Sequence, residues 1–138
     1  MRVLAIDFGF KRIGVALGES EFDIATPRPS IAASGALKKD AAALHTLARA
    51  EEADAVVLGL PVEEDGQEGK MARICRMLAE HLVTEGETVH LVNEVYSSLE
   101  AENALAEAKV RITRRKQLRD GEAACVIVQR FFDGQTTT

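Results

Sequence analysis

The chain has 138 residues, of which 46% are hydrophobic and 28% are charged. This length suits one globular domain, and this composition excludes a disordered or collagen-like chain. We therefore expect a single domain over residues 1–138, with 134–138 as a flexible tail. The formal net charge of −5, taken alone, argues against a polyanionic partner.

The charge is unevenly distributed along the sequence. The segment 109–119 holds six of the 17 Lys and Arg residues and none of the 22 acids, which leaves 11 cations and a formal charge of −11 elsewhere. A basic run without acids lacks local salt-bridge partners. This favours a loop that contacts phosphates over a solvated charge run.

The first half of the chain predicts strands followed by a helix. Apolar runs at Val3–Ile6 and Ile13–Leu17 predict two strands, joined closely enough for a hairpin. Two prolines restrict the stretch 26–31 to an edge strand. Helical spacing of apolar residues predicts a helix over 40–52, with Asp40 as its N-cap.

The second half alternates strands and helices. The continuous apolar run Ala55–Leu60 predicts a central strand covered on both faces. Four further elements are predicted after it: a helix over 71–82, a strand over 89–92, a helix over 97–108 that begins with a capping box, and a last helix that starts near Asp120. This order predicts an α/β fold, in which helices flank a mixed sheet.

Three carboxylates are candidates for a metal site. Asp7 closes the first strand, Glu94 closes the last one, and Asp120 has helical spacing with the inward positions of the final helix. Taken singly, they also fit a turn residue, a helix lead-in and an N-cap. Because parallel strands end at one edge of the sheet, the set is expected to converge there. Glu122 is the alternative ligand if the helix is rotated.

Converging carboxylates repel one another unless a cation neutralises them. Oxygen ligands suit Mg²⁺ or Mn²⁺, which would activate a water for phosphodiester hydrolysis. The cations expected to contact the nucleic acid are Lys11, Arg12, Arg111, Arg114, Arg115, Lys116 and Arg119.

Other residue types carry weaker signals. Phe10 and Tyr96 flank the expected site and fit either stacking on one base each or hydrophobic packing at its rim. The three histidines have no metal-binding spacing and receive no role. Cys75 and Cys125 lie in apolar stretches, which indicates buried thiols rather than zinc ligands.

The stretch Ala5–Ala16 (AIDFGFKRIGVA) strongly resembles the opening motif of the YqgF (RuvX) family. Further matching blocks follow in the family's order, covering Met1 to about Phe132: Val57–Pro61 with Asp65 and Gly66, Asn93 and Glu94 with Tyr96–Ser98, and Asp120 before an Ala-rich helix. The resemblance implies a ribonuclease H-like fold, a likeness to Holliday junction resolvases and a nuclease role in 5′-end maturation of precursor 16S ribosomal RNA. It also implies that Asp7, Glu94 and Asp120 are metal-binding acids.

Some positions depart from the family pattern, among them the region of Glu63, near which the family usually has Asn. Phe10 stands where the family usually has Thr, and Asn93 and Val95 replace the Asp and Arg that usually flank the glutamate. The metal acids themselves are kept. The missing Arg removes either a contact to phosphate or a contact that supports the metal ligands, which bears on substrate preference and on the level of activity.

The leading hypothesis is a cytoplasmic Mg²⁺- or Mn²⁺-dependent nuclease acting on RNA, without a signal peptide or membrane span. Cleavage of branched DNA stays open, as does nucleic-acid binding without catalysis. A junction resolvase needs two symmetric sites, so a stable dimer would favour DNA and a monomer would favour RNA. Actin-like ATPases and sugar kinases have a similar first phosphate loop, but they need two such domains, for which this chain is too short.

Overall fold

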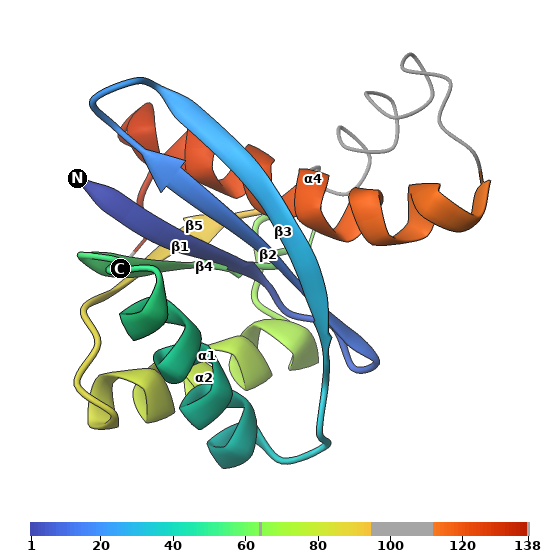
Figure 1. Cartoon of the computed structure of the whole chain (residues 1–138). Helices are drawn as coiled ribbons and strands as arrows, with labels where there is room; N and C mark the ends of the chain where they lie inside the picture. Colours follow the sequence, from blue (N-terminus) through green and yellow to red (C-terminus); the bar gives the residue numbers. More distant parts are fainter. Residues whose placement is uncertain (64, 95–111, 138) are drawn as a thin grey trace.

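The computed structural model describes residues 1–63, 65–94 and 112–137, and for 112–120 the backbone alone. Its elements are β1 (Arg2–Asp7), β2 (Arg12–Glu19), β3 (Ile24–Ala32), α1 (Leu37–Ala50), β4 (Ala55–Leu60), α2 (Lys70–Thr84), β5 (Val89–Asn93) and α4 (Ile112–Phe132). The strands form one sheet in the order β3-β2-β1-β4-β5. Helices α1 and α2 cover one face and α4 covers the other (Figure 1). The predicted mixed sheet with flanking helices is confirmed.

Strand direction decides where the polar strand ends meet. Strands β1, β4 and β5 run parallel, whereas β2 pairs antiparallel with both β1 and β3. The predicted hairpin and the edge position of β3 are therefore confirmed, and so is the central strand, because all six residues of β4 are buried. The carboxyl ends of β1, β4 and β5 share one edge of the sheet, which we call the carboxyl edge.

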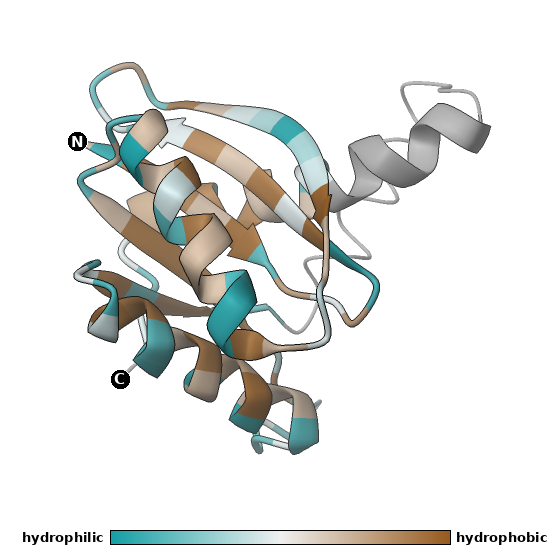
Figure 2. Ribbon diagram, turned by 60° about the horizontal axis from the view of Figure 1, so that its bottom comes forward, coloured by the Kyte–Doolittle hydropathy of each residue, from teal (hydrophilic) through white to brown (hydrophobic). Residues whose placement is uncertain are grey.

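Side-chain alternation divides the core into two layers. Along β1, Leu4 and Ile6 pack with α1 and α2, while Val3 and Ala5 pack with α4. Figure 2 shows hydrophobic residues running along the central strands, with hydrophilic residues on the helices and turns. Because the side-chain period of a strand is two, Asp7 continues the row of Val3 and Ala5 on the α4 face.

Helix α1 begins earlier than the sequence predicts. Its N-cap is Ala36, so the prediction of Asp40 as N-cap is wrong. Asp40 lies in the first turn, buried, and its Oδ1 accepts the Ser34 N–H at 2.9 Å. The helix extends back to Leu37 because this side chain packs against the core. The Asp40 carboxylate bonds backbone ahead of the helix, although it does not occupy the cap position.

Helix α4 also begins earlier, at Ile112 instead of near Asp120. Residues 112–119 of the basic segment are therefore helical, and the prediction of a loop there is wrong. Arg, Lys, Gln and Leu are all strong helix formers, and the segment contains neither Gly nor Pro. Gly121 lies within the helix without breaking it, at a place where a Cβ would come within 2.7 Å of Pro27 Cβ on β3.

The last residues lie beside β5. Thr137 donates its N–H to the Leu91 carbonyl at 2.7 Å and its hydroxyl to Asn93 Oδ1 at 2.8 Å. The flexibility of 134–138 stays a prediction, and the helix predicted over 97–108 lies outside the described residues. Across the described residues, none of the helices is apolar over the length that a membrane span requires.

Candidate active site

The site begins with Asp7, at the end of β1 on the carboxyl edge. Asp7 is opposite Gly14 on β2, and the preceding residue, Ile6, is paired with Leu58 on β4. The next residue of β4 is Gly59. Cross-strand neighbours lie about 4.8 Å apart, so Asp7 has a glycine beside it on each adjacent strand. Neither neighbouring strand therefore adds a side chain of its own directly beside Asp7.

Glu94 extends β5 by one residue toward the same edge. Its N–H donates to the Leu60 carbonyl at 3.1 Å, and Arg130 donates to the Asn93 carbonyl at 2.8 Å, which hold this backbone beside β4 and α4. A Cβ built on Gly59 would lie 2.8 Å from Glu94 Cδ and would overlap Oε2. The Glu94 carboxylate thus occupies the space that the side chain of any larger residue at position 59 would fill. This space is on the α4 face of the sheet, the face that Asp7 shares.

The pKa of the Cys75 thiol is affected by both carboxylates. Burial and, to a smaller extent, the negative charges of Glu94 and Asp7 raise its pKa to about 12. One buried side chain of α2 therefore lies within electrostatic range of both acids. We call Asp7 and Glu94 the acid pair. A thiol with this pKa stays protonated at neutral pH and is a poor nucleophile.

The prediction of two buried thiols is confirmed. Cys75 and Cys125 are both free and buried, and burial also raises the pKa of Cys125 to about 12, with Glu122 as the second cause. Neither cysteine lies within a disulfide.

Asp120 lies within α4, eight residues after the helix begins, so it is not an N-cap. Two helical turns further on, Ile127 packs over Gly59, where a Cβ would lie 2.6 Å from its Cδ1. The side chain of Asp120 is outside the described part of the chain, so its convergence with the acid pair stays a prediction. Within the described part, no three acids, His or Cys form a metal-binding group.

Glu122, the alternative ligand, lies in a different neighbourhood. It lines a groove with Cys125 and the segment 23–25 at the start of β3. The start of β3 pairs with Glu19 of β2, and Glu19 in turn pairs with Arg2, the first residue of β1. The 23–25 side of the groove is therefore at the end of the sheet opposite to Asp7.

The predicted cations fall into two groups. Lys11 and Arg12 lie in and after the β1–β2 turn, at the carboxyl edge, and Lys11 is exposed. Arg114, Arg115, Lys116 and Arg119 belong to α4, which places them before Asp120 on the same helix. Arg111 lies outside the described residues, as does Tyr96. Phe10 is 64% exposed on the β1–β2 turn.

The histidines take part in packing and pairing. His45 Nδ1 lies 2.7 Å from Glu87 Oε2, and His90 packs on Phe131 with ring centroids 5.0 Å apart. His81 lies in the last turn of α2. No described histidine belongs to a metal-binding group.

Residues 1–134 match the family described as "RuvX: Holliday junction resolvase". The chain belongs to the RuvX family. A relative from Nitrosospira multiformis named "Putative pre-16S rRNA nuclease" is 40% identical, and the match covers 98% of this chain and 89% of the relative. Membership therefore rests on nearly the full length of the sequence.

Two solved structures share the fold of this RuvX chain. Thermus thermophilus RuvC, in complex with a Holliday junction substrate, superposes with a TM-score of 0.61 at 14% identity, over 99% of both chains. The fowlpox virus Holliday junction resolvase gives a TM-score of 0.56 at 12% identity, covering 97% of this chain and 98% of that one. The predicted ribonuclease H-like fold is confirmed.

Sequence reasoning missed the glycines of this RuvX site. Gly59 interrupts a continuous apolar run, and Gly14 lies within the second strand. A glycine inside a strand often marks a close approach of another group, so the signal was present. The group that approaches Gly59, however, comes from a strand more than thirty positions later, which only the fold reveals.

Proposed function

We propose that this chain is a metal-dependent nuclease that hydrolyses phosphodiester bonds of RNA, in the 5′-end maturation of precursor 16S ribosomal RNA. The observation that carries the proposal is the acid pair, brought together across Gly59 at the carboxyl edge. A ligand at this edge of an α/β sheet meets the ends of several strands. The name of the Nitrosospira relative supports RNA as the substrate. A single domain in the cytoplasm is part of the same proposal.

The acid pair suits Mg²⁺ or Mn²⁺. Two negatively charged carboxylates near each other repel, and a bound cation offsets this repulsion. Hard divalent ions prefer oxygen ligands. Asp7 and Glu94 would hold the ion, with Asp120 as the proposed third ligand. When bound, the ion supplies the positive charge that lowers the pKa of water and stabilises the leaving oxygen of a phosphodiester.

The cations of the chain would bind and orient the substrate. Lys11 and Arg12 would contact phosphates at the carboxyl edge, and the basic residues of α4 and Arg111 would contact the strand on its way to the acid pair. The proposed interface therefore combines a turn and a helix.

A cleavage assay tests the proposed reaction. We expect the purified chain to cut a structured RNA in Mg²⁺ or Mn²⁺ and to lose all cutting in excess EDTA, because the acid pair alone provides no positive charge to activate water. Readdition of Mn²⁺ should restore the products. Cleavage that continues in EDTA would overturn the metal dependence, and an intact RNA in every metal would overturn the nuclease.

A salt titration tests the helical cations. Replacing Arg114, Arg115 and Lys116 by Gln should weaken RNA binding and reduce the slope of log K against log salt by about two to three, because fewer counterions are released. Gln preserves the helix. The matched control exchanges the same residues for the other cation, Arg to Lys and Lys to Arg, and should keep the slope. An unchanged slope in the Gln variant would remove this segment from the interface.

Cleavage of branched DNA is the second candidate, favoured by the fold shared with RuvC bound to a Holliday junction. The cleavage assay therefore includes a four-way DNA junction and a single-stranded RNA beside the structured RNA. A dimer in solution together with symmetric cuts in the junction would favour a resolvase. A monomer that cuts only RNA supports the main proposal, and binding without cleavage favours a non-catalytic protein.

A further inference from the structure

A small apolar cavity opens beside the β1–β2 turn. Phe8 and Phe10 of this turn, the segment 33–37, Asp40 of α1 and Ile74 of α2 line it, and it encloses about 210 Å³. The two phenylalanine rings meet edge to face with centroids 6.4 Å apart. Cavities for drug-sized ligands measure about 300–1,000 Å³, so this one has room for a single flat ring system and not for a whole nucleotide.

The polar wall of the cavity is a buried carboxylate. Asp40 is only 4% exposed, and its Oδ1 accepts the Ser34 N–H at 2.9 Å. Its Oδ2 is buried and has no hydrogen-bond partner within the part of the chain that the structure describes. A buried acceptor without a donor is costly. A ring that entered the cavity with an N–H directed at Asp40 would supply the donor that the protein lacks.

The cavity lies at the carboxyl edge on the α1 and α2 side of the sheet, whereas the acid pair lies on the α4 side. Phe8 directly follows Asp7, and its side chain points to the opposite face of the sheet. Ile74 directly precedes Cys75, the thiol whose pKa responds to both Glu94 and Asp7. Exposed Lys11 lies in the same turn, where its carbonyl accepts the Ala33 N–H at 3.0 Å. A strand that leaves the acid pair around the carboxyl edge would therefore meet the cavity.

We propose that this cavity binds one unstacked nucleobase that carries an exocyclic amino group, from a nucleotide next to the phosphodiester at the acid pair. The base stacks on Phe10 and donates its amino hydrogen to Asp40 Oδ2. This inference rests on the proposed function, since it takes the substrate to be an RNA strand. Single-stranded RNA is commonly read in this way, by aromatic stacking and by hydrogen bonds to base edges.

The carboxylate selects among the bases by their hydrogen-bonding groups. Adenine, cytosine and guanine each carry an amino donor, whereas uracil has carbonyl acceptors in the corresponding positions. Uracil can donate only its ring N3–H on this edge, and a uracil that directs N3–H at Asp40 brings a carbonyl acceptor on either side of it toward the carboxylate, which adds repulsion between acceptors. The cavity should therefore disfavour uracil beside the cleavage position.

Binding of labelled homopolymers without metal tests the inference. We measure fluorescence anisotropy of short oligo(A), oligo(C) and oligo(U) with the full chain in EDTA. The wild type should bind oligo(A) and oligo(C) about tenfold more tightly than oligo(U). Phe10→Ala should weaken binding of oligo(A) and oligo(C) roughly tenfold through the loss of one stacking contact.

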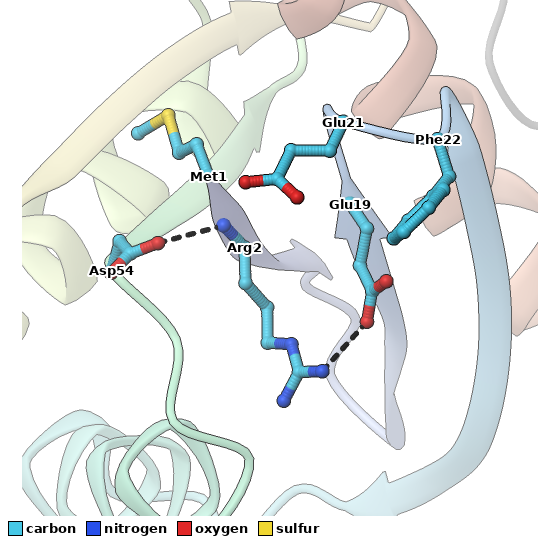
Figure 3. Close-up of a pocket in the computed structure, with 6 residues that line it drawn as sticks. All are labelled: Met1, Arg2, Glu19, Glu21, Phe22 and Asp54. Atoms are coloured by element: carbon cyan, nitrogen blue, oxygen red, sulfur yellow. Dashed lines mark hydrogen bonds and ion pairs between the residues drawn. The ribbon is translucent and has the colours of Figure 1, made fainter.

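Phe22→Ala is the matched control. Phe22 is 66% exposed, against 64% for Phe10, so both variants remove a similar surface ring. Figure 3 shows Phe22 beside Glu19 and Glu21, in a pocket shared with Arg2 at the start of β1. This position is at the end of the sheet opposite to the acid pair. Phe22→Ala should bind all three homopolymers as the wild type does.

Asp40→Asn tests the selectivity by itself. Asn keeps an oxygen to accept the Ser34 N–H, and it places an amino donor where Oδ2 was. The preference for oligo(A) and oligo(C) over oligo(U) should disappear, while a thermal melt checks that the fold is intact. If this variant fails to fold, Phe10→Ala against Phe22→Ala decides the outcome.

The outcomes separate this inference from the proposed nuclease. Equal binding of the three homopolymers by the wild type, or equal behaviour of Phe10→Ala and Phe22→Ala, would overturn the cavity even if RNA is cut. Base preference that depends on Phe10 and Asp40 supports the cavity even if no RNA is cut, and the chain would then be a non-catalytic RNA-binding protein. No binding of any RNA contradicts both proposals.

Discussion

Asp7→Asn is expected to lower metal-dependent RNA cleavage by roughly a hundred- to a thousandfold, with little change in the thermal unfolding midpoint. The amide has nearly the shape of the carboxylate, so the pairing of β1 with β2 at Gly14 should persist. It carries no charge, however, and is a much weaker ligand for a hard divalent ion. It also relieves repulsion within the acid pair, which works against any loss of stability.

The comparison for Asp7→Asn is Asp23→Asn, which also removes one negative charge. Asp23 lies between β2 and β3 and lines the groove at the end of the sheet opposite to the acid pair. Its φ of 51° is a conformation that Asn also tolerates. Cleavage rates and Mn²⁺ titration calorimetry should both separate the two variants. If Asp7→Asn cleaved RNA as fast as Asp23→Asn, the acid pair would not be the active site.

Gly59→Ala is expected to reduce Mn²⁺ affinity and cleavage by roughly ten- to a hundredfold. The new Cβ would overlap Glu94 Oε2 and lie 2.6 Å from Ile127 Cδ1. Both contacts are the ends of flexible side chains, so the fold can adjust, at a cost of about 1–3 kcal/mol in the free energy of unfolding. The adjustment moves the Glu94 carboxylate away from Asp7. The damage should therefore appear in metal binding more than in stability.

Gly18→Ala is the matched control, because its new Cβ would also crowd a side chain of α4 but would not contact the Glu94 carboxylate. On β2, a Cβ at position 18 would lie 2.5 Å from Val128 Cγ1, so α4 is pushed in a similar way. This variant should lose similar stability but keep Mn²⁺ affinity. Adding Glu94→Asp to Gly59→Ala should restore part of the affinity, because the shorter side chain leaves room for the Cβ. Equal losses of Mn²⁺ affinity in Gly18→Ala and Gly59→Ala would reduce Gly59 to a packing role.

Helix boundaries were the least predictable part of the fold. Asp40 and Asp120 both have the character of N-caps, yet both lie inside helices. The competing signals were the core contact of Leu37 for α1 and the run of strong helix formers before Asp120 for α4. Local propensity identified the helices, whereas packing and the longer helix-forming run decided where they begin.

The central strands were predictable for a simple reason. Runs such as Val3–Ile6 and Ala55–Leu60 are too apolar to be left exposed, and their length suits strands. Their ends placed Asp7 and Glu94 among the candidates, and the family motifs selected the same residues. The sequence by itself thus determined the fold class, the family and the candidate acids.

Only the tertiary structure decided how these acids meet. The parallel pairing of β1, β4 and β5 brings Asp7, Gly59 and the end of β5 to one edge of the sheet, and the missing side chain of Gly59 leaves space for the Glu94 carboxylate. The tertiary structure likewise places Phe8, Phe10 and Asp40 around one cavity. Contacts between distant parts of a chain depend on strand register and helix packing, which no local pattern encodes.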